Sequence, residues 1–474
     1  MGCFMKEKTL PTCSREEWNF SIANDFELTA EIFHNPYEIP LDRLFSVAAR
    51  KNKNRRFLFV SKILGKHIPV PPYISLLGGA ALAATYMEAI YGKKTTLIES
   101  IIEAIAQEKK CEETYQLIKK NPFVLPEPVI FIGFAETATA LGHSVFDCFS
   151  HGCTYIHTTR EKIPEMASLI NFEEEHSHAT SHRYYSVDKD LLKSSSPVVL
   201  IDDEITTGKT ALNFITAIQK KYPRKDYVVV SLLDWRSEED QQRFRLLESK
   251  LGIRIQTVSL ISGRIKIREK MNREVTKVNP PTEKAEGEGL TSQVEIKTLC
   301  FDEFFPNILP FSSVNSLGEK NKTPYLLETG RFGIGSKDKN IVDEATEAIG
   351  SILRKMRKGK YSLCLGTGEF IYLPMRIAAH MGEGVRYHAT TRSPIFPEKR
   401  ENYAVQNAFS FESPDDPEII NYLYNIPYAS YDDLYIFFER EIPSQRLAPL
   451  VEVAKKLGIS HVFFIFCVGG KRYE

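Results

Sequence analysis

The 474-residue sequence has no net charge, only two tryptophans and no closely spaced pair of cysteines. Lys plus Arg and Asp plus Glu both number 61, so we expect no broad basic surface for nucleic acid or an anionic membrane. The eight cysteines include no CxxC pair, which favours reduced thiols over a disulfide framework. No apolar run is long enough to suggest a membrane span. These features predict a cytoplasmic protein without nucleic-acid or membrane partners.

The length predicts two or three domains, since a single core rarely extends beyond 250 to 300 residues. Hydrophobic content of 43% and charged content of 26% are typical of a globular protein. A polar segment with two adjacent prolines lies near residue 280 and indicates a linker. We therefore expect an N-terminal arm or cap (1–30), a first domain (31–270), a linker and connector (271–325) and a second domain (326–474).

The most informative stretch is residues 198–210, with the sequence VVLIDDEITTGKT. Four aliphatic residues predict a strand buried on both faces, and Asp202 and Asp203 stand where that strand ends. A turn of small, hydroxyl-bearing residues follows, and residues 211–221 have apolar positions at helical spacing. Strand, turn and helix in this order place backbone amides and a helix dipole at the turn, which is a suitable site for phosphate.

A nucleotide P-loop would need glycine five positions before Gly208, where this sequence has Asp203. The stretch instead resembles the phosphoribosyl pyrophosphate (PRPP) motif of type I phosphoribosyltransferases. That resemblance implies an α/β fold with a mainly parallel sheet flanked by helices. It implies that Asp202 and Asp203 hold the ribose hydroxyls and, through water or substrate, Mg²⁺. The 5′-phosphate would then be bound by the turn, made of Thr206, Thr207, Gly208, Lys209 and Thr210.

A second loop, after the predicted strand 128–132, matches the place where this family binds pyrophosphate. The resemblance assigns that role to Phe134, Ala135, Glu136 and Thr137, and to Arg160 after the next strand. Strand, glycine and helix in succession are common in α/β proteins. The assignment therefore depends on the position of this loop upstream of the PRPP motif. Glu136 would either reach the metal through water or make a structural hydrogen bond.

Residues 161–185 are rich in histidine and acidic residues and lie between two predicted strands. By resemblance they form a flap that closes over PRPP, with His176, His178 and Arg183 acting in catalysis. A metal cluster of His176, His178 and His182 and a solvated hairpin without chemistry are the alternatives.

Asp234 and Trp235 end a later predicted strand, where members of the family contact the acceptor base. Packing of Trp235 on a neighbouring side chain is an equally good interpretation. The position of Thr206 is acidic in purine-salvage members and threonine in orotate-type enzymes, so the resemblance favours an acceptor other than a purine.

The second half of the sequence repeats landmarks of the first. Arg331-Phe332 resembles Arg56-Phe57, the GTGE segment at 366–369 matches GFAE at 133–136, and TTR recurs at 158–160 and 390–392. Residues 437–442 (FFEREI) fall where 200–205 (LIDDEI) would, which pairs Asp203 with Arg440. An arginine cannot accept hydrogen bonds from ribose hydroxyls, so we predict a degenerate copy of the first domain that does not bind PRPP in the usual way.

The second half also resembles a named family. Thr391, Arg392, Ser393 and Pro394 form the signature of the TRSP domain, which follows a phosphoribosyltransferase domain in bacterial tellurite-resistance and stress gene clusters. With Glu369 of the repeated loop, Thr391, Arg392 and Ser393 are the candidate site residues of this domain.

Taken together, the resemblances imply a Mg²⁺-dependent transferase that joins PRPP to a base-like acceptor, or runs the reverse reaction, in the metabolism of a nucleotide or nucleoside-like compound. A non-catalytic sensor of PRPP and a bifunctional enzyme with a second site remain alternatives. Homodimers are common in the phosphoribosyltransferase family, so the resemblance makes a homodimer possible here.

Overall fold

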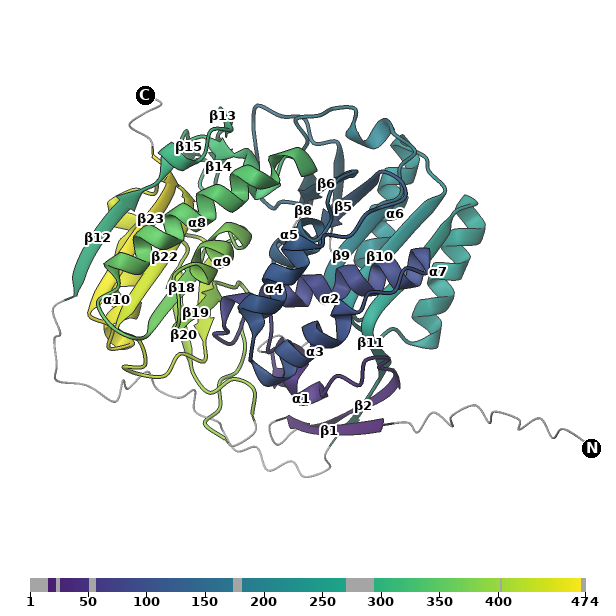
Figure 1. Ribbon diagram of the computed structural model, residues 1–474, viewed down its shortest axis with the longest axis horizontal. Coiled ribbons are helices and arrows are strands. Elements are labelled where there is room, and N and C mark those ends of the chain that lie inside the picture. Colours follow the sequence, from purple (N-terminus) through teal and green to yellow (C-terminus); the bar gives the residue numbers. More distant parts are fainter. Residues whose placement is uncertain are drawn as a thin grey trace, which may run out of the picture.

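The computed structural model describes residues 16–22, 26–50, 57–173, 181–269, 294–400 and 403–469. Within these residues the chain forms two α/β units that lie side by side, each built on its own sheet (Figure 1). His176 and His178 fall outside the described residues.

The first sheet has eight strands in the order β1-β2-β11-β10-β9-β5-β6-β17. Its five central strands are parallel, and their aliphatic side chains are buried on both faces, as expected for a sheet covered by helices. The bounds of the central strands are β5 (Val129–Gly133), β6 (Cys153–His157), β9 (Val198–Ile205), β10 (Asp226–Asp234) and β11 (Arg254–Glu269), and those of the antiparallel additions are β1 (Glu16–Ile22), β2 (Phe26–His34) and β17 (Ile334–Gly335).

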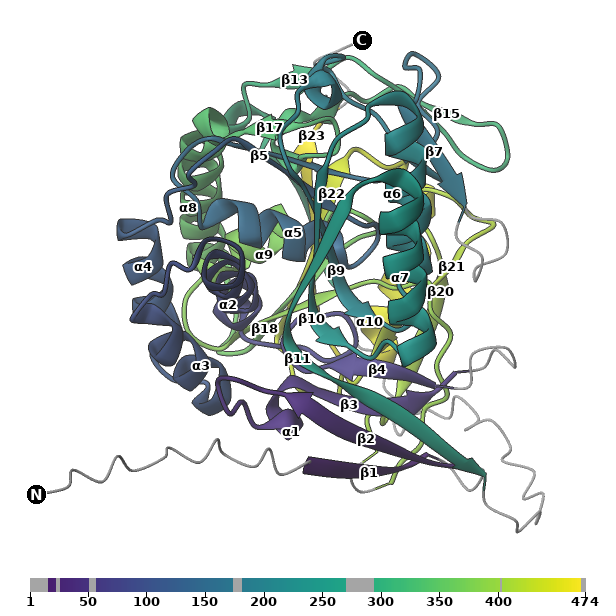
Figure 2. The same ribbon diagram turned by 90° about the vertical axis from the view of Figure 1, so that its right-hand side faces the viewer.

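Helices cover both faces of this sheet (Figure 2). On one face lie α2 (Pro72–Tyr91) and α5 (Ala138–Asp147), with α3 (Leu97–Gln107) and α4 (Cys111–Lys120) packed on α2. On the other lie α6 (Lys209–Lys221) and α7 (Glu238–Leu251). In the part of the chain that the structure describes, α2 alone has the length and apolar composition of a membrane span, but 83% of its apolar window is buried inside the fold.

The second sheet has five strands, all parallel, in the order β12-β23-β22-β18-β19. This order and direction reproduce β11-β10-β9-β5-β6 of the first sheet. The bounds are β12 (Glu295–Cys300), β18 (Ser362–Gly366), β19 (Val385–Ala389), β22 (Asp433–Arg440) and β23 (His461–Val468), with helices α8 (Lys339–Met356), α9 (Tyr372–Ala379) and α10 (Ala448–Lys456). The second half is thus an α/β unit with the same sheet core, as the repeated landmarks predict.

Short elements complete the two units. Each is a two-stranded antiparallel pair. The pairs are β3 (Phe45–Ala49) with β4 (Phe57–Ser61), β7 (Ile170–Glu173) with β8 (Ser181–Tyr184), β13 (Ile308–Leu309) with β16 (Tyr325–Leu326), β14 (Ser313–Val314) with β15 (Lys320–Asn321), and β20 (Ala408–Glu412) with β21 (Ile420–Tyr424).

Two segments differ from the division expected from sequence. Residues 1–30 were expected to form an N-terminal arm or cap, and the described part of this segment lies in β1 and β2, which extend the first sheet where β2 pairs with β11. The expected connector 271–325 contains β12, which is the edge strand of the second sheet. Both differences have one cause: a short strand gains its stability from a partner that is distant in sequence.

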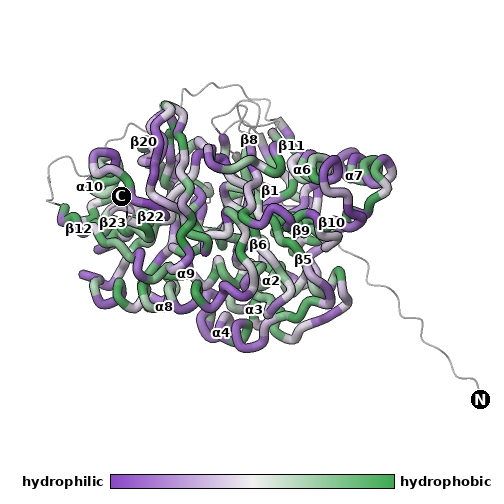
Figure 3. The backbone as a smooth tube through the Cα atoms, turned by 90° about the horizontal axis from the view of Figure 1, so that it is seen from above, coloured by the Kyte–Doolittle hydropathy of each residue, from purple (hydrophilic) through white to green (hydrophobic). Residues whose placement is uncertain are grey.

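The two units share an extensive interface. A hydrophobic cluster joins β3 and β4 to the second unit and contains Ala48, Leu58, Val60, Ile395, Tyr403, Val405 and Tyr424. On the opposite side, the ring of His143 in α5 stacks on Tyr372 of α9 at 3.7 Å, and Asp147 binds Arg376 at 3.0 Å. β17, from the second half of the chain, pairs with β6. Figure 3 shows hydrophobic residues along the strands inside the molecule and hydrophilic ones on outer turns such as those of α4 and α7.

Candidate functional site

The acidic pair lies at the carboxyl end of β9, as predicted. Asp202 and Asp203 are both half-buried, and the Asp203 amide donates to Asp202 Oδ1 at 2.9 Å. Lys66 Nζ lies 3.7 Å from Asp203 Oδ2. Asp203 also lines a cavity of about 20 Å³ below the β3–β4 pair, beside Phe59 and Ser61. The carboxylates are therefore accessible, but the cavity next to them is too small to hold a sugar phosphate.

The turn after β9 has the form of an anion cradle. Thr206, Thr207, Gly208, Lys209 and Thr210 are all half-buried, so the turn is not folded into the core. Gly208 adopts φ +72°, and a Cβ there would approach the Phe244 ring to 2.4 Å. Helix α6 begins at the next residue without a side-chain cap, which leaves its first amides directed at the turn. Glycine is thus required for both the backbone conformation and the close packing.

The loop after β5 is more enclosed than the resemblance implies. Phe134 and Ala135 are buried, and their amides already donate to Ile201 O at 3.2 Å and to Thr158 Oγ1 at 2.9 Å. Two of the amides expected to grip pyrophosphate therefore have internal acceptors. Those of Glu136 and Thr137, at the start of α5, remain the candidates for that role.

Glu136 makes a structural contact that reaches the second unit. Its carboxylate lies 3.8 Å from Arg160 Nη1 and 3.6 Å from Arg392 Nε. These two arginines end the equivalent TTR segments of the two units. The two roles considered for Glu136 were a contact to the metal through water and a structural hydrogen bond. The structure shows a structural contact, in which the carboxylate lies between Arg160 and Arg392.

The segment 161–185 contains the β7–β8 hairpin. His182 on β8 is fully buried against the Phe172 ring, with centroids 5.2 Å apart. Arg183 donates to the carbonyl of Arg160 at 2.9 Å and is half-buried. No group of three His, Cys, Asp or Glu residues suited to a metal occurs among the described residues, and the tip with His176 and His178 is not among them. The hairpin itself is thus observed, and its role in closure stays a prediction.

Asp234 and Trp235, predicted to contact the acceptor, have structural partners. Asp234 forms a two-point ion pair with Arg236, with nitrogen–oxygen distances of 2.9 and 2.6 Å. Trp235 is buried and stacks on Phe59 at 5.0 Å, with Phe45 at its edge. The packing interpretation of Trp235 therefore accounts for its position.

A much larger cavity, of about 1490 Å³, lies between the two units. Arg160 and Arg183 line it from the first unit, and Gly368, Arg392 and Arg440 line it from the second. Asp202 and Asp203 are not part of its lining. This cavity is therefore beside the second sheet, not at the PRPP motif, and sequence reasoning did not anticipate it.

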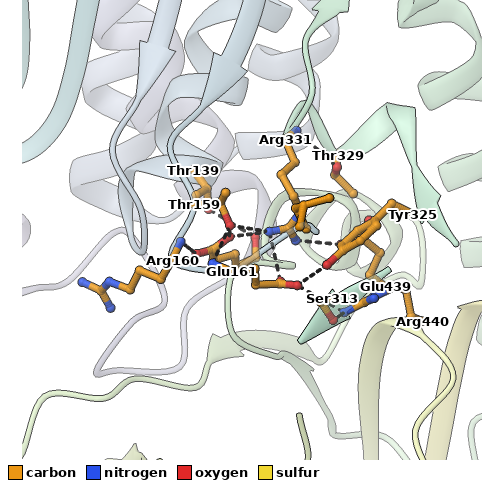
Figure 4. Close-up of polar contacts among 12 residues, drawn as sticks. Thr139, Thr159, Arg160, Glu161, Ser313, Tyr325, Thr329, Arg331, Glu439 and Arg440 are labelled. Atoms are coloured by element: carbon orange, nitrogen blue, oxygen red, sulfur yellow. Dashed lines mark hydrogen bonds and ion pairs between the residues drawn. The ribbon is translucent and has the colours of Figure 1, made fainter. Parts of the chain in front are cut away.

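Buried charges form one wall of this cavity (Figure 4). Arg331 is only 2% exposed, and its guanidinium contacts Glu369, Glu439 at 2.7 Å and Glu161 at 3.1 Å. Burial alone would raise the pKa of Glu369, but the attraction of Arg331 together with hydrogen bonds from Thr159 and the Arg160 amide outweighs it and brings the pKa down to about 2. Glu369 also accepts from Thr159 Oγ1 at 2.6 Å and from the Arg160 amide at 2.7 Å. Glu369, a candidate site residue, thus holds the two units together.

Among the other signature residues, only Arg392 reaches the large cavity. Thr391 is buried and accepts from the Ser393 amide at 3.3 Å, while Ser393 O accepts from Tyr424 at 2.7 Å. Thr391 and Ser393 therefore shape the turn that presents Arg392.

The strand registers correct one prediction about the repeat. Gly133 of β5 pairs with Ile201, and its counterpart Gly366 of β18 pairs with Phe437. This register makes Glu439, and not Arg440, the equivalent of Asp203; the equivalent of Asp202 is Phe438. The predicted pairing was wrong by one residue. Glu439 is nevertheless occupied by Arg331, so an acidic pair suited to ribose hydroxyls is absent from the described end of β22.

Other parts of the repeat coincide in detail. The Ala135 and Gly368 amides each donate to the first threonine of a TTR segment at 2.9 Å. The Arg331-Phe332 landmark is not reproduced as an element, because residues 327–338 form short turns and β17, whereas Phe57 begins β4; Arg56 is outside the described residues.

The fold and these loops define a doubly wound α/β protein with a glycine-containing turn between strand and helix at the carboxyl edge of a parallel sheet. Sequence comparison gives the family. Residues 44–264 match the phosphoribosyl transferase family, and residues 328–454 match the TRSP domain that lies C-terminal to it. The chain thus contains a phosphoribosyl transferase domain that is followed by a TRSP domain.

A comparison with curated proteins found no match. Solved structures similar to part of the chain include adenine phosphoribosyltransferases from Rhodothermus marinus (14% identity, 46% of this chain and 95% of that one, TM-score 0.27) and Saccharomyces cerevisiae (11%, 47% and 98%, 0.28). A hypoxanthine phosphoribosyltransferase from Staphylococcus aureus is similar over 37% of this chain and 70% of that one, with 13% identity and a TM-score of 0.19. Similarity this low says nothing about the substrate.

Proposed function

We propose that the first unit transfers ribose 5-phosphate from PRPP to a base-like acceptor and releases pyrophosphate. The observation that carries the proposal is the acidic pair at the end of β9 followed directly by the open Gly208 turn and α6. A sugar phosphate lying across this edge would place its hydroxyls at the acids and its 5′-phosphate at the turn. Such a ligand needs more room than the 20 Å³ beside Asp203, so the proposal requires the β3–β4 pair or the β7–β8 hairpin to move on binding.

The residues of the site suit the charge that develops during transfer. Cleavage at the anomeric carbon leaves positive charge on the ribose ring, which Asp202 and Asp203 stabilise while orienting the hydroxyls. Donors from the turn hold the phosphate end, and Arg183 on the hairpin brings a positive charge toward the leaving pyrophosphate. Lys66, 3.7 Å from Asp203, balances the acids before the substrate arrives.

The donors fit Mg²⁺ as a substrate-borne cation. Mg²⁺ prefers carboxylate oxygen, keeps several waters and is commonly held by one or two carboxylates together with substrate phosphates. Asp202 and Asp203 would supply such oxygens to a cation that arrives with PRPP. When bound there, Mg²⁺ would neutralise charge on the pyrophosphate.

The test is the double variant Asp202→Asn with Asp203→Asn, which keeps the size of both side chains but removes their negative charge and replaces one acceptor oxygen of each with an NH₂ donor. We expect pyrophosphate release from PRPP, measured with a panel of bases, to fall at least a hundredfold with an unchanged melting temperature. Asp190→Asn, at an exposed surface residue, is the control and should keep full activity. Full activity in the double variant would refute the assignment, and tight PRPP binding without turnover by the wild type would indicate a sensor.

A further inference from the structure

The large cavity lies where a parallel sheet binds its ligands. In the second sheet the chain runs from β18 to β19 on one side and then to β22 on the other, so the order reverses between β18 and β22. Open α/β sheets bind ligands outside the carboxyl ends of the strands at this point. The loops that follow both strands, represented by Gly368 and Ser444, line the cavity. We propose that the cavity is a second ligand site, for a small molecule that carries a phosphate monoester.

Charge identifies the class of ligand. Nine Lys and Arg residues line the cavity against seven Asp and Glu residues. Several of the acids are occupied: Glu369 and Glu439 bind Arg331, and Glu161 lies 3.1 Å from both Arg331 and Arg440. Among the lining side chains alone, the cations exceed the acids by two, which favours an anion.

Two arginines are placed to bind that anion. Arg160 and Arg392, one from each unit, share the single carboxylate of Glu136 at 3.8 and 3.6 Å, which leaves one positive charge uncompensated. Glu136 Oε1 has no hydrogen-bond partner among the described residues, so neither arginine is locked in a tight pair. In Figure 4 the Arg160 guanidinium points away from the buried cluster around Arg331. Planar guanidinium groups suit phosphate because they donate two parallel hydrogen bonds.

The backbone leaves room at the same place. Gly368 has φ +55°, and no atom lies within 4 Å of where its Cβ would be, although the residue lines the cavity. Its first-unit counterpart, Ala135, is buried. The loop after β18 is therefore open, whereas the loop after β5 is packed.

This second site would not recognise PRPP by its ribose diol, because Phe438 and the Arg331-bound Glu439 replace the two acids. Recognition would rest on the phosphate and on cations from both units. Since Arg160 belongs to the first unit, the site is complete only in the full chain.

Ribose 5-phosphate is a suitable probe because it could occupy both phosphate sites. Isothermal titration of the full-length protein is expected to show two equivalents bound. Arg392→Gln or Lys322→Glu should remove one equivalent, by weakening it at least tenfold. Arg386→Gln, at a surface ion pair on β19, the strand that leads to Arg392, should leave both equivalents. Thr207→Val with Thr210→Val should remove the other equivalent. Inorganic phosphate should compete with ribose 5-phosphate for binding, whereas ribose, which has no phosphate, should not.

The outcomes separate this inference from the proposed function. A single equivalent that is lost in the threonine variant but keeps its affinity in both Arg392→Gln and Lys322→Glu overturns the second site and leaves the first standing. A single equivalent lost only in the cavity variants supports the second site and contradicts the first. Lys322 is exposed, so its variant tests the site even if the Arg392 variant does not fold.

Discussion

His157 is buried at the carboxyl end of β6, where its Nδ1 donates to the Thr158 carbonyl at 2.8 Å. Burial disfavours the imidazolium, and the nearby Arg331 repels it, so the pKa of His157 falls to about 4. The unfolded chain, with a pKa near 6.5, therefore binds more protons than the folded one between these values. Stability is lost as the pH drops through this window.

We predict that the free energy of unfolding falls by about 2 kcal/mol from this histidine alone between pH 7 and pH 5. His157→Gln, which keeps a donor, should show a smaller loss by that amount in urea titrations at the two pH values. His67, His143 and His388 are also buried with lowered pKa values and contribute in the same direction. His157→Gln therefore removes only part of the pH dependence of the free energy of unfolding.

Among the carboxylates, Glu328 titrates in this window because burial raises its pKa to about 7, but it does so equally in the wild type and in the variant. The pKa of Glu369 is lowered to about 2, so its stabilising effect is complete above its ordinary value of 4.5 and is lost only below it. If the wild type and the His157→Gln variant lost equal free energy of unfolding between pH 7 and pH 5, the assignment of this pH dependence to His157 would be wrong.

At the scale of elements, the turn between β9 and α6 depends on Gly208. Gly208→Ala introduces a side chain at φ +72°, which costs about 1 kcal/mol, and also pushes a methyl group into the Phe244 ring. We expect a loss of stability greater than the backbone cost and a KM for PRPP raised at least tenfold, because the turn must shift. Chemical denaturation and steady-state kinetics measure the two effects.

Gly252 provides the matched control for this variant. It ends α7 at φ +64°, but no atom lies within 4 Å of where its Cβ would be. Gly252→Ala should show the backbone cost alone, with the KM unchanged. Equal effects of the two variants would show that the contact with Phe244 does not shape the turn.

The elements that sequence predicted correctly are those with a strong local pattern. The aliphatic run of β9 predicts a strand and the small and apolar residues of α2 predict a helix, whatever partners these elements pack against. The acidic pair and the Gly208 turn were predicted because their residue types are set by local geometry.

What sequence missed depends on contacts distant along the chain. Residues 437–442 can be aligned with β9 in two registers, because Glu439 can match either Asp202 or Asp203, and only the pairing of Gly366 with Phe437 decides between them. Trp235 and Glu369 are residue types common in binding sites, but their partners Phe59 and Arg331 come from remote segments. The cavity between the units has no local signal, since residues from both halves of the chain line it.

For the whole molecule, the interface predicts that the two halves assemble even without a covalent link. Chains 1–281 and 282–474, produced together, should co-purify in equal amounts and unfold in a single transition, since the cluster around Tyr424 and the Asp147–Arg376 pair would otherwise be exposed. Pull-down through a tag on one chain, followed by calorimetry, measures this.

A shorter second chain tests the edge of the second sheet. The fragment 326–474 lacks β12, which would leave β23 as an unprotected edge strand. We expect this fragment to aggregate or fail to co-purify with 1–281. Equal recovery of both fragments would show that β12 is dispensable.

The place of β12 also bears on the ancestry of the chain. In the first unit the strand next to β10 is β11, which comes last in the sequence, whereas in the second unit the strand next to β23 comes first. A plain tandem duplication would preserve the order, whereas a circular permutation of the second unit would account for the difference. In such a permutant the present break lies between the end of β23 and the start of β12. These two points are at opposite edges of the sheet because the strands are parallel, so a gene that restores the order of the first unit would need a crossover segment between them.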